Sequence, residues 1–152
     1  MTLLRNPVDS ALAKAAPAME RFLIGTTLTR WISFWETTNG HLPLVPVVPF
    51  ANLIADPSGV INRINRRFGT SFSNEFPESD QVFMEMERIR LANQGGLASD
   101  KPNPNIPDPR IANKEAMLRP EAEQHQLATP AMKLYRELLE KVSSDWPATG
   151  TS

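Results

Sequence analysis

Hydrophobic residues recur along the chain at the spacing of helical faces, and two short apolar runs interrupt that pattern. One face follows the i, i+3, i+4, i+7 rule throughout: Leu28, Trp31, Ile32 and Trp35. Asn39-Gly40 is typical of the end of that helix. Before it, Asp9 is a candidate cap for a helix from Ser10 that Pro17 kinks or restarts. The inward face of that first helix would consist of Leu12, Ala15, Met19, Phe22 and Leu23.

The two apolar runs predict strands. Leu3-Leu4 is expected to end a buried strand that turns into a helix, and the run Leu44 to Phe50 is short and β-branched in its middle. Pro46 and Pro49 remove two ladder donors, so the second run favours an edge strand or a distorted one. The order strand, helix, helix, strand, helix is typical of an α/β crossover with parallel strands. We therefore predict a helix-dominated α/β fold with two parallel strands and about five helices.

Further helices have clear start and stop signals. Asp56-Pro57 supplies a cap and a first helical residue, and Gly69 ends that helix. Its apolar face comprises Val60, Ile61, Ile64 and Phe68. Ser79 caps another helix that Gly95-Gly96 closes, with an inward face of Val82, Phe83, Met86 and Ile89.

Thr129-Pro130 opens the last predicted helix, on whose solvent side Glu137 and Lys141 form an i, i+4 pair. Its inward stripe is Ala131, Leu134, Tyr135, Leu138 and Val142. Between the helices, residues 97–114 have no apolar period and contain a proline cluster, which predicts a Pro-rich irregular loop. The chain thus divides into an α/β unit over residues 1–96, this loop, and a terminal helical segment with a frayed tail over residues 115–152.

Composition and charge exclude several classes of partner and site. With 16 basic and 17 acidic residues the formal charge is −1, so no overall field favours nucleic acid or an acidic membrane. The sequence has no cysteine, which excludes disulfides, thiol catalysis and Cys-based metal sites. It shows neither a signal peptide nor a membrane-spanning run, and we expect a cytoplasmic protein.

Four segments, taken in order, resemble the second half of bacterial sulfotransferases. They are Leu3-Leu4-Arg5-Asn6-Pro7-Val8-Asp9, Trp31-Ile32-Ser33-Phe34-Trp35-Glu36, Val47-Val48-Pro49-Phe50-Ala51-Asn52-Leu53-Ile54-Ala55-Asp56-Pro57 and Arg63-Ile64-Asn65-Arg66-Arg67-Phe68-Gly69-Thr70. Leu118-Arg119-Pro120-Glu121 is similar in placement to the family's tail. By this resemblance, residues 1–96 would be the C-terminal half of a P-loop-like domain. Because only two residues precede the first strand end, we expect the preceding half to be absent.

The resemblance implies transfer of a sulfuryl group from 3′-phosphoadenosine 5′-phosphosulfate to a hydroxyl or amine on a small-molecule or carbohydrate acceptor. In such an in-line displacement the protein mainly positions the partners and neutralises negative charge. The family pattern assigns the 3′-phosphate to Arg5 and to a serine eight residues later, where this sequence has Ala13. Ser10 lies on the same helical face and is the candidate replacement. The alternative role of Arg5 is a surface ion pair with Asp9.

One part of the family's machinery is missing from the sequence. No Gly-rich stretch followed by Lys-Ser or Lys-Thr is present to cradle the 5′-phosphosulfate. We therefore expect the isolated chain to be inactive, with its catalytic base unassigned. The missing N-terminal half, or self-association, would cover the exposed strand at Leu3-Leu4 and Val45 to Val48. The alternative is a non-catalytic helical interaction module that keeps the family scaffold.

Other residues that could carry chemistry favour structural roles. Two isolated histidines make no metal or catalytic site, so His41 is predicted in a loop and His125 on a helix surface. Arginines in the last turn of a helix complement its dipole, which is the interpretation for Arg63, Arg66 and Arg67. The helical spacing of Trp31, Phe34 and Trp35 favours packing in the core over stacking on a base or sugar. Four carboxylates lack the spacing of a catalytic pair: Glu75, Glu78, Glu85 and Glu87.

Overall fold

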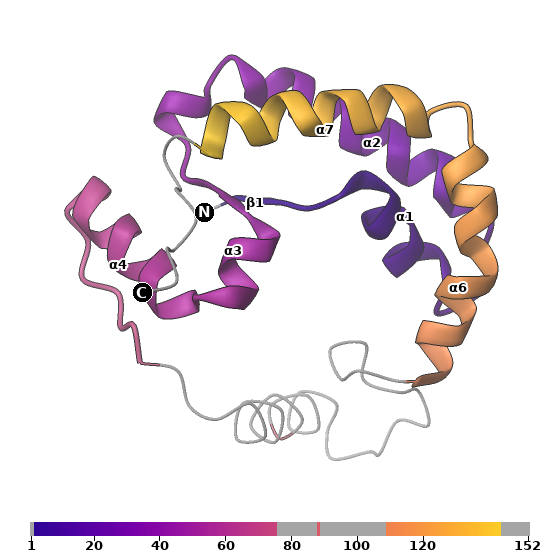
Figure 1. Ribbon diagram of the computed structural model, residues 1–152, viewed down its shortest axis with the longest axis horizontal. Coiled ribbons are helices and arrows are strands. Elements are labelled where there is room, and N and C mark those ends of the chain that lie inside the picture. Colours follow the sequence, from indigo (N-terminus) through magenta and orange to yellow (C-terminus); the bar gives the residue numbers. More distant parts are fainter. Residues whose placement is uncertain (1, 76–87, 89–108, 144–152) are drawn as a thin grey trace.

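The computed structural model describes residues 2–75, 88 and 109–143 (Figure 1). Its elements are β1 (Thr2–Leu4), α1 (Pro7–Ala15), α2 (Phe22–Asn39), a 3₁₀ helix (Leu42–Leu44), β2 (Val47–Pro49), α3 (Phe50–Ala55), α4 (Pro57–Phe68), α6 (Pro109–Gln124) and α7 (Ala128–Ser143). Helices dominate, and the pattern is consistent with the predicted α/β class. In Figure 1, α7 lies along α2 and α6 lies beside α1, while α3 and α4 occupy the opposite side of the molecule. None of the described helices is both long and apolar enough to cross a membrane.

The sheet consists of β1 and β2 running parallel, as predicted. Leu4 is paired with Pro49, so the carboxyl ends of both strands meet at the same edge. The second strand is shorter than the predicted run, because Leu44 ends a 3₁₀ helix and Phe50 already begins α3. Pro46 still takes part in the ladder through its carbonyl, which accepts the Thr2 N–H at 2.8 Å. A proline lacks a donor but not an acceptor, which explains its place beside a two-stranded ladder.

The first helix begins three residues earlier than predicted. Asn6, not Asp9, is its cap, and the Asn6 Oδ1 accepts from Val8 N at 2.9 Å and from Asp9 N at 3.3 Å. Pro7 occupies the first helical position, where no backbone donor is needed. Ser10 therefore lies inside α1 rather than at its start.

The chain reverses between α1 and α2 through a short turn around Pro17. Met19 adopts a left-handed backbone with φ of 55°, which breaks the helical phase between the two helices. Phe22 was expected on the inward face of the first helix, but it begins α2 and is 70% exposed. Because α2 begins at a different rotation about its axis, the helical spacing counted from α1 across Pro17 does not predict which way Phe22 faces.

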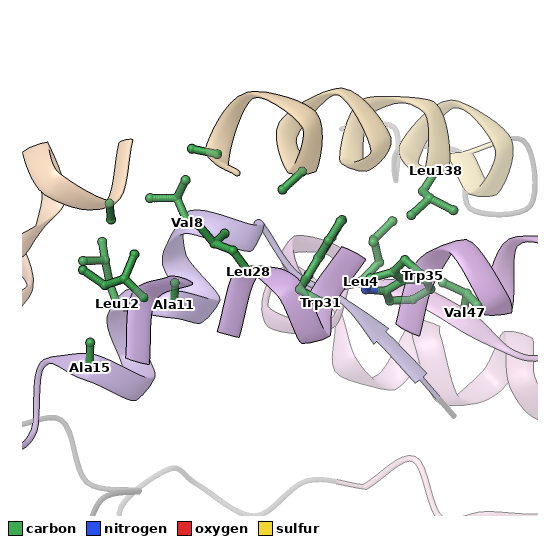
Figure 2. Packing of buried hydrophobic residues seen from close by; sticks show 14 of the residues in the cluster. Leu4, Val8, Ala11, Leu12, Ala15, Leu28, Trp31, Trp35, Val47 and Leu138 are labelled. Atoms are coloured by element: carbon green, nitrogen blue, oxygen red, sulfur yellow. The ribbon is translucent and has the colours of Figure 1, made fainter. Parts of the chain in front are cut away.

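One hydrophobic core joins the elements (Figure 2). The predicted α2 stripe is confirmed: Leu28, Trp31 and Trp35 are buried and Ile32 is half-buried. Leu138 and Val142 of α7 face the same core, as predicted for the last helix. Because α1 packs against α2, α6 and α7, segments far apart in the sequence share this core.

The sheet contributes to this core more fully than predicted. Leu4, Val47 and Val48 are buried, and β2 also contacts α7. The apolar strand surface expected to lie exposed is therefore mostly covered by the chain itself, although Leu3 remains 37% exposed. Helices α3 and α7 both contact β2 and contribute to this cover.

Helix α4 follows its predicted signals closely. The Asp56 Oδ1 accepts from Gly59 N at 2.8 Å, and Pro57 is the first helical residue. Gly69 ends the helix in the left-handed conformation with φ of 65°, which glycine adopts without steric cost. Val60 and Ile64 are buried as predicted, whereas Phe68 at the last turn is exposed.

The irregular loop predicted to extend to Lys114 ends earlier, because α6 begins at Pro109. Proline suits that first position, and α6 also holds Pro120 in its interior. Leu118 and Ala122 of this helix are buried. Apart from residue 88, the helix predicted from Ser79 lies outside the described residues, as do residues 97–108 of the loop and the terminal tail from residue 144.

Candidate functional site

Arg5 stands at the carboxyl edge of the parallel sheet. It follows β1 directly, and its guanidinium carbon lies 5.1 Å from the centroid of the Phe50 ring, which follows β2. The backbone at Arg5 is held from another side, since Trp31 Nε1 donates to the Arg5 carbonyl at 3.2 Å. In open α/β sheets, ligands bind outside the carboxyl ends of parallel strands. The structure therefore brings the predicted arginine to that edge and gives it an aromatic neighbour.

Ser10, the other predicted contact, is engaged within its own helix. Its Oγ donates to the Asn6 carbonyl at 2.8 Å, the residue one turn earlier. A hydroxyl that binds a phosphate oxygen has to donate its one proton. Ser10 would therefore have to release the Asn6 carbonyl before it could take the role of a phosphate ligand.

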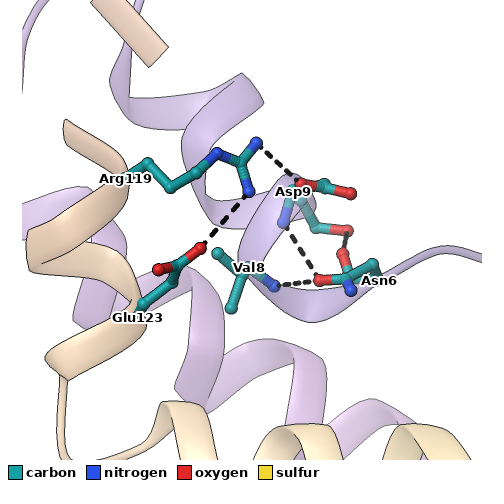
Figure 3. Close-up of polar contacts among 6 residues, drawn as sticks. Asn6, Val8, Asp9, Arg119 and Glu123 are labelled. Atoms are coloured by element: carbon teal, nitrogen blue, oxygen red, sulfur yellow. Dashed lines mark hydrogen bonds and ion pairs between the residues drawn. The ribbon is translucent and has the colours of Figure 1, made fainter. Parts of the chain in front are cut away.

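Asp9, the alternative partner considered for Arg5, is paired with a residue far along the chain instead (Figure 3). Arg119 of α6 approaches Asp9 of α1, with Nη2 donating to Oδ1 at 3.0 Å. Arg119 Nη1 also lies 3.7 Å from Glu123 Oε1, one turn further along α6. Arg119 thus lies between two carboxylates and fastens α6 to the start of α1.

A pocket of about 330 Å³ opens beside this network. Its polar lining comes from Asn6, Arg119, Glu123, Thr129 and Arg136, and its apolar walls include Val8 and Met132. Sequence reasoning placed neither Arg119 nor Arg136 in a site. The one local signal was the four-residue spacing of Arg119 and Glu123 and of Met132 and Arg136, which puts each pair on one helical face.

Tyr135 lies close to the same network. It is half-buried and packs edge-on against Trp31, with ring centroids 6.3 Å apart. Burial raises the pKa of its phenol above the ordinary value of 10.0, and the negative charge of Asp9 raises that pKa further. Tyr135 is therefore held neutral at physiological pH and is suited to structure rather than to proton abstraction.

The structure places one histidine where it was predicted and the other elsewhere. His41 is exposed in the loop before the 3₁₀ helix, as predicted. His125 lies in the turn between α6 and α7 rather than on a helix surface, and its Nδ1 accepts from Leu127 N at 3.2 Å. Its ring sits over Gly25 of α2, where a Cβ would come within 2.8 Å of Nε2. Among residues 2–75 and 109–143, no cluster of three side chains could hold a metal ion.

The arginines of α4 and the aromatic residues of α2 also have structural contacts. Arg67 Nη2 donates to the Pro43 carbonyl at 3.3 Å, and its guanidinium carbon lies 5.4 Å from the Phe68 ring centroid. Trp31 and Trp35 are buried in contact with each other, as core packing predicted. Phe34 differs from the core prediction, since it is exposed. Its ring contacts Trp35 in an edge-on arrangement.

Comparison of the chain with protein-family models, with curated proteins and with solved structures finds no match. The likeness to sulfotransferases thus depends on the quoted sequence segments alone.

Proposed function

We propose that this chain is part of a sulfotransferase-like enzyme that uses 3′-phosphoadenosine 5′-phosphosulfate, with Arg5 as the ligand of the 3′-phosphate. The observation that supports this most is the position of Arg5 where the carboxyl ends of two parallel strands meet. A planar guanidinium presents two parallel donors to a phosphate, and the contact with Phe50 limits its rotamers. A pre-positioned cation of this kind suits an anionic nucleotide.

The residues fit only one end of that co-substrate. Arg5 can hold the 3′-phosphate, but the sequence contains no Gly-rich loop with a lysine for the 5′-phosphosulfate. When bound, the co-substrate would supply the transferable sulfuryl group. The contribution of this chain would be to bind and orient the nucleotide, and sulfuryl transfer would require that loop from elsewhere.

The proposal predicts nucleotide binding without turnover. Titration calorimetry of the chain with adenosine 3′,5′-bisphosphate should show saturable binding, and Arg5→Gln should weaken it by roughly 10-fold or more, because a charge-assisted bond is lost. Arg30→Gln is the matched control, since Arg30 is exposed on α2 and its substitution removes the same charge. The chain alone should transfer no sulfuryl group.

Two results would contradict this function. One is the absence of saturable binding of adenosine 3′,5′-bisphosphate. The other is equal affinity in wild type, Arg5→Gln and Arg30→Gln, because a bound nucleotide would then not depend on the proposed ligand.

A further inference from the structure

The pocket between α1, α6 and α7 has more hydrogen-bond donors than its own residues use. Asn6 Oδ1 is taken by Val8 N and Asp9 N, which leaves the Asn6 amide nitrogen as a donor. Within the described part of the chain, the Asn6 amide nitrogen, the Thr129 hydroxyl and the Arg136 guanidinium have no acceptor. All three residues line this one pocket.

The charges around the pocket are arranged unevenly. The carboxylates of Asp9 and Glu123 both approach Arg119, at 3.0 and 3.7 Å, so each has a cationic neighbour. Arg136 has no such partner within the described residues. A ligand that enters beside Arg136 therefore meets a cation whose charge is not already paired.

We infer that this pocket binds a small molecule bearing a phosphate or sulfate ester. Such a group offers several acceptor oxygens and matches the planar donor fork of arginine. The volume of about 330 Å³ exceeds that of a single inorganic ion, and Val8 and Met132 provide an apolar wall for an organic substituent. The pocket is a separate site from the proposed nucleotide contact, because Arg5 does not line it.

Phenyl phosphate and phenyl sulfate are suitable probes because they combine the anion with a small apolar body. We expect saturable binding of one or both by calorimetry, and none of benzyl alcohol, which lacks the anion. Arg136→Gln should weaken binding by roughly 10-fold or more. Lys133→Gln is the matched control, because Lys133 is exposed on the same helix, carries the same charge and does not line the pocket.

Glu123→Gln should have the opposite effect on binding to that of Arg136→Gln. Removing this carboxylate eliminates a repulsive charge in the pocket, so the variant should bind the anionic probes roughly 3- to 10-fold more tightly. A general electrostatic attraction would instead respond equally to Arg136→Gln and Lys133→Gln. That equality, or binding of benzyl alcohol as tight as that of the anions, or no saturable binding of either anion, would overturn the inference.

The two proposals fail separately. Arg5→Gln should leave the affinity for phenyl phosphate unchanged, and Arg136→Gln should leave the affinity of the Arg5-dependent site for adenosine 3′,5′-bisphosphate unchanged. Loss of both affinities in Arg136→Gln, with the variant still folded by circular dichroism, would contradict the existence of two sites.

Discussion

At the scale of single residues, the structure gives several polar groups a role that their neighbours in sequence do not indicate. Asp9 meets Arg119, which is 110 residues away, and His125 packs over Gly25. Both partners reach each other only after the helices have packed. A prediction from local spacing alone, such as the Arg5–Asp9 ion pair, could not include such partners.

Tyr135 is the only tyrosine in the sequence, so its ionisation can be followed directly by tyrosinate absorbance. Its pKa should lie above 10.0 in the folded protein and fall part of the way back in Asp9→Asn, because burial remains when the charge is removed. Arg119→Gln removes a charge of opposite sign and should not lower this pKa. A Tyr135 pKa at or below 10.0 in the wild type would contradict the packing described.

The raised pKa of Tyr135 also makes the free energy of unfolding depend on pH. A phenol whose folded pKa is raised stabilises the folded state fully below its unfolded pKa, and this contribution is lost as pH rises through the folded pKa. The free energy of unfolding should therefore decrease above about pH 10 more steeply in the wild type than in Tyr135→Phe.

At the scale of elements, local signals predicted the helices that have a clear apolar stripe or a clear start and end signal. The α2 stripe, the Asp56-Pro57 start and Gly69 end of α4, and the α7 stripe all follow this rule. The start of α6 was missed, since its sequence lacks a clear apolar face and its buried Leu118 and Ala122 pack in the shared core with α1. The first helix was placed late because Asn6 and Asp9 are both good caps, and only Asn6 precedes a proline.

The cap of α4 can be tested on its own. Asp56→Ala should lower the free energy of unfolding by about 1 kcal/mol, because Gly59 N loses its acceptor. Asp56→Asn keeps an oxygen at the same position and should cost much less. Denaturant unfolding of the three proteins measures both effects, and equal destabilisation by the two substitutions would argue against the cap.

At the scale of the whole molecule, stability depends on packing among α1, α2, α6 and α7 more than on ion pairs. Arg119 and Asp9 are 44% and 41% exposed, so their pair should contribute at most about 1 kcal/mol. The pocket depends on the same packing: Asn6 caps α1, Arg119 lies on α6 and Arg136 lies on α7, so the pocket exists only once those helices have met. The edge position of Arg5 was more predictable, because adjacent strand ends fix it.

Leu118 and Met117 are neighbours in α6 that test this packing directly. Leu118 is 1% exposed and Met117 is 71% exposed. Leu118→Ala should cost about 2–5 kcal/mol of unfolding free energy, whereas Met117→Ala should change it by about 0.5 kcal/mol or less. Similar costs for the two substitutions in denaturant titrations would mean that α6 is not held against the core by the described face.

The contact between α1 and the helices near the other end of the chain has a consequence for biosynthesis. Ribosomes add roughly 5 to 20 residues per second, so Asp9 waits about 5 to 20 seconds before Arg119 is made. During that interval α1 lacks α6 and α7, two of the three helices that pack against it in the folded protein. The first helix is thus only partly covered, by α2, until the last two described helices have been translated.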